Sequence, residues 1–134
     1  MITWSGLYSV GVEEIDDQHK HFFALIGELF HANDSKETAE TLPPYLLKEL
    51  AAYAEYHFAT EEKYFDLYHY EHADEHKSEH QRFKVRVAEL SAHHDSGGAD
   101  TIALLAEFMG DWLANHIAQS DKKYVQCFKE HGLA

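Results

Sequence analysis

The sequence predicts an all-α fold, an antiparallel up-down-up-down four-helix bundle with an irregular N-terminal arm and a short C-terminal helix. Apolar residues recur at steps of three and four over four long segments, which is the pattern of amphipathic helices. Only 7 glycines and 2 prolines occur in 134 residues, and they cluster where loops are expected. Short polar connections between long helices favour antiparallel neighbours. We expect residues 1–134 to form one domain, because a chain of this length can bury a core of its own.

The first predicted elements are an arm and a helix. Residues 1–15 show no helical period and are interrupted by Gly6 and Gly11, so we expect an arm that lies across the bundle. Asp16 is a suitable N-cap for a helix over about residues 17–33. The apolar stripe of this helix consists of Phe22, Phe23, Ile26, Leu29 and Phe30.

The second predicted helix follows a polar loop at residues 34–42 and covers about residues 43–66. Pro43 and Pro44 suit its first turn, where a proline leaves no hydrogen bond unmade. Its buried face is predicted to consist of Leu46, Leu47, Leu50, Tyr53, Ala54, His57, Glu61, Tyr64 and Phe65.

The second half of the chain repeats this organisation. A turn at residues 67–71 precedes a third helix over about 72–94, and the Asp-Ser-Gly-Gly break at 95–98 precedes a fourth over about 99–118. The stripe of the fourth helix ends in Trp112, Leu113 and His116. A short amphipathic segment then carries Tyr124, Val125 and Phe128.

Histidine and carboxylate side chains recur on these helices at helical spacing. Residues four apart lie on the same face of a helix, so His57 and Glu61 project together, as do His76 and His80. In an antiparallel bundle, the start of the first and third helices lies level with the end of the second and fourth. The candidate ligands alternate in this way, which predicts a metal site at one end of the core. They are His19, His57, Glu61, His76, His80, His116 and Asp121.

The composition of this candidate set favours two ions. Five histidines and two carboxylates are more than one ion requires, and zinc sites usually take four ligands. Structural zinc sites also favour cysteine, of which the chain has only Cys127. A mixed set of imidazoles and carboxylates is better suited to iron or manganese. Seven ligands shared by two ions, with both carboxylates bridging, would use every group.

Four short motifs carry these residues. They are Ile15–Lys20 (IDDQHK), His57–Glu62 (HFATEE), His76–His80 (HKSEH) and Trp112–Asp121 (WLANHIAQSD). Each is weak alone, but together and in this order they resemble the hemerythrins, and the single-domain bacteriohemerythrins most closely. The resemblance covers nearly the whole chain, so we expect residues 1–134 to be a hemerythrin-like di-iron domain.

The resemblance implies a non-haem di-iron centre with an oxo or hydroxo bridge, at which O2 binds reversibly. Under this resemblance His76, His80 and His116 hold one Fe ion, His19 and His57 hold the other, and Glu61 and Asp121 bridge the pair. With three bridges, the iron with three histidines reaches six ligands. The iron with two histidines keeps an open position for O2 or for a small anion such as azide.

Reversible binding requires a dry pocket, because water would promote oxidation of the irons. We predict that this pocket is lined by Phe23, Ile26, Phe58, Trp112 and Leu113. The matching leucine of the family places Leu113 nearest the oxygen. The chain departs from the family at Phe65, where methionine is frequent, and at Glu71, where proline is frequent.

Several positions leave alternatives open. His72 lies one turn before His76 and could extend the histidine stripe. Asp121 lies five residues after His116 instead of four, so it could cap the last segment instead of bridging. Glu62 lies about 100° further round the helix than Glu61 and is expected at the surface or behind a ligand. Gln18 and Glu79 flank ligands and could orient them from behind, although solvated side chains are the favoured expectation.

The formal net charge of −13 argues against nucleic acid or an anionic membrane surface as a partner. No apolar run approaches the roughly 20 residues of a membrane span. The chain begins with Met1, no signal peptide is evident, and one cysteine fits a reducing compartment, so we expect a cytoplasmic protein. We expect a monomer, and nothing in the sequence indicates which protein could be its partner.

Oxygen carriage, storage or delivery is the function that these residues favour. A domain that senses oxygen or redox state within a signalling system is an alternative, although no signalling region flanks the motifs. A di-iron oxidase or peroxidase is another. Such enzymes typically use more carboxylates, whereas five histidines against two carboxylates favour binding without turnover.

Overall fold

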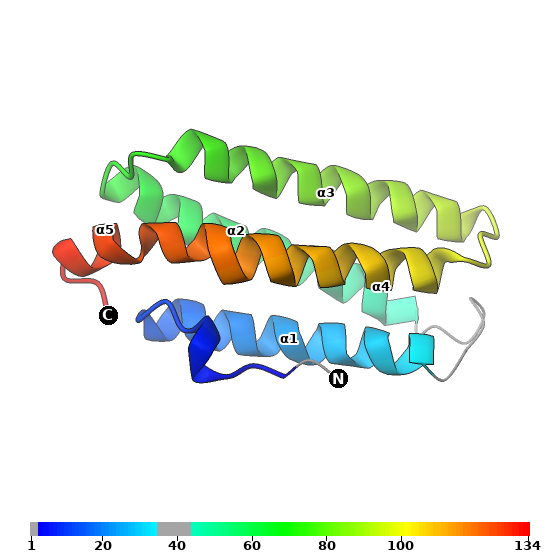
Figure 1. Cartoon of the computed structure of the whole chain (residues 1–134). Helices are drawn as coiled ribbons and strands as arrows, with labels where there is room; N and C mark the ends of the chain where they lie inside the picture. Colours follow the sequence, from blue (N-terminus) through cyan, green and yellow to red (C-terminus); the bar gives the residue numbers. More distant parts are fainter. Residues whose placement is uncertain (1–2, 35–43) are drawn as a thin grey trace.

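The computed structural model describes residues 3–34 and 44–134. The described residues form four long helical rods, namely α1 (Glu13–Asp34), α2 (Pro44–Leu67), α3 (Ala73–Asp95) and a fourth that begins with α4 (Thr101–Trp112). These rods lie side by side (Figure 1). Each rod contacts its neighbour in the chain, and α1 also contacts α4, so the bundle closes into a ring. No strand occurs in the described ranges. The predicted all-α four-helix bundle is confirmed.

The fourth rod is not one regular α-helix. After α4 it continues as a π-helix, η2 (Leu113–Ser120), then as a 3-10 turn, η3 (Asp121–Tyr124), and ends as α5 (Val125–Glu130). The backbone N–H of Asp121 donates to the carbonyl of His116, five residues back, which is the hydrogen bond of a π-helix. The prediction of a plain α-helix to residue 118 is therefore wrong over its last turns.

The start of α1 also differs from the prediction. The helix begins at Glu13, so Asp16 is not its N-cap but lies in its first turn. The Asp16 carboxylate accepts hydrogen bonds from the hydroxyl of Ser9 at 2.5 Å and from the N–H of Val10 at 2.9 Å. Asp16 thereby ties the arm, which contains the short turn η1 (Gly6–Tyr8), to the helix along which it lies (Figure 1).

The connections follow the sequence closely. The turn between α2 and α3 covers residues 68–72, with His69 in the left-handed region at φ +52°. The connection between α3 and α4 contains Gly97 at φ +86°, a conformation that glycine adopts without strain. Helix α1 extends to Asp34, and the rest of the predicted loop, together with Pro43, lies outside the described residues.

Two apolar clusters fill the interior. The larger runs along most of the bundle, and the smaller lies at one end and consists of Val10, Val12, Ile15, Phe65, Tyr70, Tyr124 and Phe128. On α1, His19 lies between Ile15 of the smaller cluster and Phe22 of the larger one. On α2, Glu61 lies between Phe58 and Phe65 in the same way. A buried polar layer therefore separates the two clusters.

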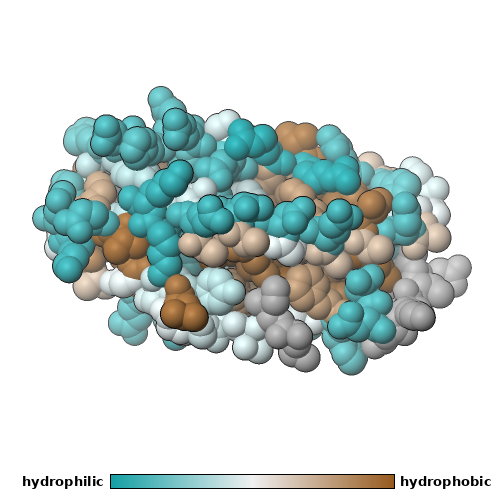
Figure 2. Space-filling view, in the orientation of Figure 1, coloured by the Kyte–Doolittle hydropathy of each residue, from teal (hydrophilic) through white to brown (hydrophobic). Residues whose placement is uncertain are grey.

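The displayed face of the bundle carries both hydrophilic and apolar side chains. Figure 2 shows hydrophilic side chains over its upper part and apolar areas mainly below them. Across residues 3–34 and 44–134, none of the helices combines the length and the apolar character that crossing a bilayer would require.

Candidate metal centre

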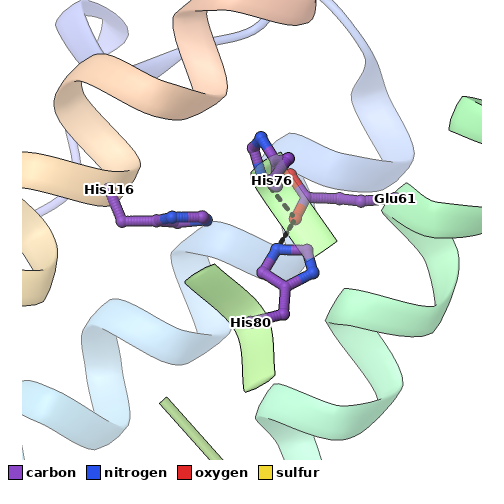
Figure 3. A group of neighbouring side chains, drawn as sticks. All are labelled: Glu61, His76, His80 and His116. Atoms are coloured by element: carbon purple, nitrogen blue, oxygen red, sulfur yellow. Dashed lines mark ion pairs between the residues drawn. The ribbon is translucent and has the colours of Figure 1, made fainter. Parts of the chain in front are cut away.

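The polar layer contains all seven side chains that the sequence analysis named as ligands. Each has a relative exposure of 3% or less. They come from all four rods: His19 from α1, His57 and Glu61 from α2, His76 and His80 from α3, His116 from η2 and Asp121 from η3. Figure 3 shows His76, His80 and His116 converging on Glu61. The predicted convergence at one level of the core is what the structure shows.

The seven side chains form two overlapping groups, within each of which the potential ligand atoms lie within 4.8 Å of one another. The first group is Glu61, His76, His80 and His116, and the second is His19, His57, Glu61 and Asp121. Glu61 belongs to both groups. The groups differ in their histidines, because the first has three and the second has two.

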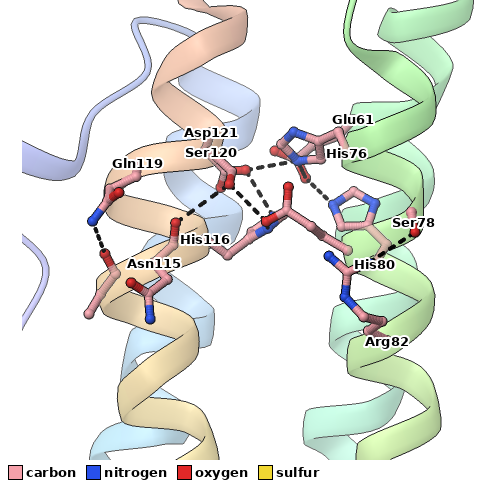
Figure 4. Close-up of polar contacts among 12 residues, drawn as sticks. Glu61, His76, Ser78, His80, Arg82, Asn115, His116, Gln119, Ser120 and Asp121 are labelled. Carbon is pink, nitrogen blue, oxygen red and sulfur yellow. Dashed lines mark hydrogen bonds and ion pairs between the residues drawn. The ribbon is translucent and has the colours of Figure 1, made fainter.

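All five imidazoles turn Nε2 toward the carboxylates. Glu61 Oε1 lies 3.1 Å from Nε2 of His80 and 3.4 Å from Nε2 of His57. Asp121 faces both groups too, because Oδ1 lies 3.0 Å from Nε2 of His116 and Oδ2 lies 3.1 Å from Nε2 of His19. Both carboxylates therefore lie between the two groups, where a bridging ligand would be placed. Figure 4 shows Glu61 and Asp121 beside the three histidines of the first group.

The π-helix explains the unusual spacing of His116 and Asp121. On an α-helix each residue advances by about 100°, so a residue five positions later points about 140° away. In a π-helix the hydrogen bond connects residues five apart, so such residues lie one above the other. Asp121 is fully buried and faces His116, which excludes the alternative that it is a surface cap.

The buried polar atoms of this layer are incompletely satisfied by the protein. Among the described residues, Nε2 of His19, His76, His80 and His116 has no properly aligned hydrogen bond, despite contacts as short as 3.0 Å. The same holds for both oxygens of Glu61 and of Asp121. A buried polar atom without a partner costs on the order of 1–3 kcal/mol, and more when it is charged. Five imidazole nitrogens and two carboxylates are a donor set that fits iron, so these residues fit a pair of metal ions.

The ionisation of the layer follows from its crowding. Burial lowers the pKa of His76, but the closely placed, negatively charged carboxylates of Asp121 and Glu61 outweigh it and raise that pKa to about 10. For His116 burial is likewise outweighed, mainly by the charge of Asp121, and the pKa is raised to about 9. Burial dominates at His57 and lowers its pKa to about 4. The pKa values of Glu61 and Asp121 are lowered by the surrounding histidines, although burial opposes this.

Behind His57 lies a hydrogen-bonded amide. Nδ1 of His57 donates to Oε1 of Gln18 at 2.8 Å, and Nε2 of Gln18 donates to the hydroxyl of Thr60 at 3.1 Å. Gln18 has a relative exposure of only 4%, so the expectation that it is solvated is wrong. Its position beside His19 suggested the alternative that it orients a ligand, but not that this ligand would be His57 on α2.

Carboxylates lie behind two other histidines. Nδ1 of His80 donates to Oε2 of Glu62 at 2.8 Å, and Nδ1 of His116 donates to Oε1 of Glu79 at 3.2 Å. The hydroxyl of Ser120 also donates to Glu79 at 2.8 Å. These hydrogen bonds lower the pKa of Glu62 and lower that of Glu79 to about 2. Glu79 is half-buried against His116, so the expectation of a solvated side chain is wrong here too.

The residues proposed to line an apolar pocket are all buried in the larger cluster. The ring of Phe58 stacks on His80 with centroids 3.9 Å apart, and Trp112 stacks on His116 at the same distance. Phe23, Ile26 and Leu113 have relative exposures of 3% or less. Their place around an oxygen molecule stays a prediction.

The structure also decides whether two further residues, His72 and Tyr124, belong to the surroundings of the site. His72 is exposed and belongs to neither group, so the alternative that it extends the stripe is not supported. Tyr124, which the sequence analysis assigned only to an amphipathic stripe, is fully buried with its ring 5.7 Å from that of His76. Its place three residues after Asp121 is the only signal that could have drawn attention to it.

The bundle and its two overlapping histidine and carboxylate groups define a carboxylate-bridged di-iron protein. The profile of the family described as "Hemerythrin HHE cation binding domain" matches residues 10–128, which is most of the chain. The chain therefore belongs to the hemerythrin family, and the two groups form a di-iron site of the hemerythrin type.

Individual relatives agree with this assignment. The chain is 31% identical over 128 residues to a bacteriohemerythrin of Pseudomonas aeruginosa, covering 96% of this chain and 82% of the relative. It is 34% identical over 122 residues to a hemerythrin-like protein of Naegleria gruberi, covering 91% and 89% respectively. A wild-type hemerythrin crystal structure superposes with a TM-score of 0.80 and 30% identity, covering 95% of this chain and 97% of the other.

Proposed function

We propose that this protein binds O2 reversibly at its di-iron site and serves oxygen carriage, storage or delivery. The observation that carries the proposal is the inequality of the two groups, because one has three histidines and the other has two. Glu61 belongs to both groups. Asp121 of the second group also lies 3.0 Å from His76 and from His116 of the first. Ions held by such groups would differ by one protein ligand. The ion with fewer ligands is the one that can accept an exogenous molecule.

Each side chain has a distinct role in this proposal. His76, His80 and His116 would hold one iron and His19 and His57 the other, with Glu61 and Asp121 bridging them. The bound irons would supply the two electrons that O2 takes up. The protein contributes neutral imidazoles, because each histidine must present an unprotonated Nε2 to a metal.

The surroundings of the layer favour binding without turnover. Apolar clusters close the polar layer on both sides, and the ligands are almost inaccessible to water. Excluding water limits the proton delivery and ligand exchange that would convert a reversible adduct into an oxidised product. We propose on this ground that the protein is a binding protein instead of an enzyme.

The decisive experiment is spectroscopic. The iron-loaded protein is reduced without oxygen, exposed to O2, and then returned to an oxygen-free atmosphere while its visible spectrum is recorded. We expect a coloured adduct that disappears when oxygen is removed, and competition from azide for the same position. Irreversible oxidation would contradict the proposal, and consumption of a reducing substrate over many turnovers would favour an oxidase or peroxidase.

A further inference from the structure

We propose that Glu62 and Glu79 are positioning residues that make the two irons electronically unequal. They place negative charge behind two histidines of the three-histidine group and behind none of the two-histidine group. The inference goes beyond oxygen binding, because it concerns how readily each iron is oxidised. It rests on the di-iron site itself and does not require that the exogenous ligand be O2.

The hydrogen bonds on the three-histidine side end in carboxylates. Glu62 on α2 accepts from Nδ1 of His80 on α3 at 2.8 Å, and Glu79 on α3 accepts from Nδ1 of His116 on η2 at 3.2 Å. The two glutamate side chains are about one quarter exposed, at 26% and 28%, whereas the histidines are buried. Each carboxylate thus links neighbouring rods and presents one oxygen to an imidazole N–H.

The two-histidine side is built differently. Nδ1 of His57 donates to the neutral amide oxygen of Gln18, which is held in turn by Thr60. Nδ1 of His19 is buried and has no hydrogen-bond partner among the residues that the structure describes. One group is therefore backed by two negative charges, and the other by an amide and an unpartnered nitrogen.

This difference acts through the imidazole ring. A carboxylate that accepts the Nδ1 proton fixes Nε2 as the metal-facing atom and increases the basicity of the ligand. A more basic ligand favours Fe3+ over Fe2+, since the higher charge is better stabilised. An amide acceptor fixes the same tautomer without adding charge. With iron bound, the three-histidine group would therefore stabilise Fe3+ more strongly than the two-histidine group would.

The test uses variants that change charge and keep the hydrogen bond. Glu62→Gln and Glu79→Gln retain an acceptor oxygen for the histidine, and Gln18→Glu adds the charge on the opposite side. Glu107→Gln, at an exposed site on α4, is the matched control for the loss of one negative charge. Iron-loaded proteins are titrated without oxygen against an electrode, and each iron gives up one electron as Fe2+ becomes Fe3+.

We expect two midpoint potentials in the unaltered protein. Glu62→Gln and Glu79→Gln should raise the lower midpoint, and Gln18→Glu should lower the higher one, so the separation shrinks in each case. Outer-partner substitutions of this kind also weaken metal binding by about 10–100-fold. Glu107→Gln should leave both midpoints unchanged.

Unchanged midpoints in Glu62→Gln and Glu79→Gln variants that still bind two irons would overturn the inference. Reduced iron content with unchanged midpoints would overturn it too, because it would assign the glutamates a purely structural role. If those variants do not fold, Gln18→Glu provides the test by itself, and an unchanged higher midpoint potential in that variant would overturn the inference. Because no oxygen is present, the outcome is independent of whether the protein binds O2 reversibly.

Discussion

Helix α3 and the π-helical segment η2 deliver ligands to the same layer by different backbone geometries. On α3, His76 and His80 are four residues apart on a regular α-helix. In η2 and the turn after it, His116 and Asp121 are five residues apart, and the π-helix brings them to one face. The surroundings of the two histidines are nevertheless alike, because His80 and His116 each have a stacked aromatic ring and a glutamate behind them.

Two ligands reach the same face of a helix only when their spacing in the sequence matches the type of helix that carries them. A spacing of four is satisfied by an ordinary helix, whereas a spacing of five requires one extra residue within a turn. The fourth rod accommodates this residue locally and returns to an α-helix at Val125. The backbone irregularity therefore lies at the metal centre, where π-helices are frequent.

Matched single-residue deletions in α3 and in the π-helix should have the largest effects, because each changes the spacing of two ligands. Deleting the exposed Ser78 from α3 should rotate His76 by about 100° relative to His80 and remove at least one iron. Deleting the exposed Gln119 should instead shorten the π-helix to an α-helix and keep both irons, because the aspartate then lies four residues after His116. Iron content per chain and far-UV circular dichroism measure both outcomes. Equal iron loss in the two variants would reject this account of the π-helix.

The ring that stacks on His80 and the ring that stacks on His116 should contribute to stability to a similar extent. Phe58→Ala and Trp112→Ala each remove a large buried ring, so we expect a loss of about 3–5 kcal/mol in the free energy of unfolding. Tyr56→Ala, at a side chain that is 57% exposed, should change it by no more than about 0.5 kcal/mol. Urea denaturation measures all three. A loss of stability in only one of Phe58→Ala and Trp112→Ala would show that the surroundings of His80 and His116 are not equivalent.

The metal-free protein should become less stable as the pH rises. The pKa values of His76 and His116 are raised to about 10 and about 9, so their protonated forms stabilise the folded state. This stabilisation is complete below the ordinary histidine pKa of about 6.5 and is lost as the pH rises through 9 and 10. We expect a decrease of about 2 kcal/mol or more in the free energy of unfolding between pH 6.5 and pH 10.

The iron-loaded protein is the control for this pH dependence. Metal ions replace the protons on the histidines, so the decrease should be absent when iron is bound. Denaturant titrations at pH 6.5, 8 and 10 make the comparison. A metal-free protein whose stability does not change across that range would contradict the raised pKa values of His76 and His116.

Leu113, the first residue of the π-helix, gives the smallest expected effect. Replacing it with serine adds a hydroxyl to the predicted pocket, and we expect oxidation of the oxygenated protein to become about tenfold faster, equivalent to about 1.4 kcal/mol in the barrier. Serine at the exposed Ala114 is the control. The loss of the visible spectrum with time measures the rate, and equal rates in both variants would remove Leu113 from the pocket.

Within single helices the sequence was a reliable guide. The apolar stripes, the pairs His57–Glu61 and His76–His80, and the common level of the ligands all follow from the 3.6-residue period and the order of the helices. Interactions between helices were not predictable in this way. For Gln18 and Glu79 the sequence allowed both a solvated side chain and a place behind a ligand, and it favoured the first. Their partners are 39 and 37 residues away in the chain, so only the packing of the helices shows that the second holds.

The sequence by itself determined the number of long helices, the face that each one buries, and the seven side chains brought to one level. These properties depend on local periodicity and on chain direction, which a sequence states directly. Only the tertiary structure decided that the fourth rod becomes a π-helix and that two carboxylates lie behind the three-histidine group. Both depend on which side chains meet across neighbouring rods, and that is set by how the rods pack.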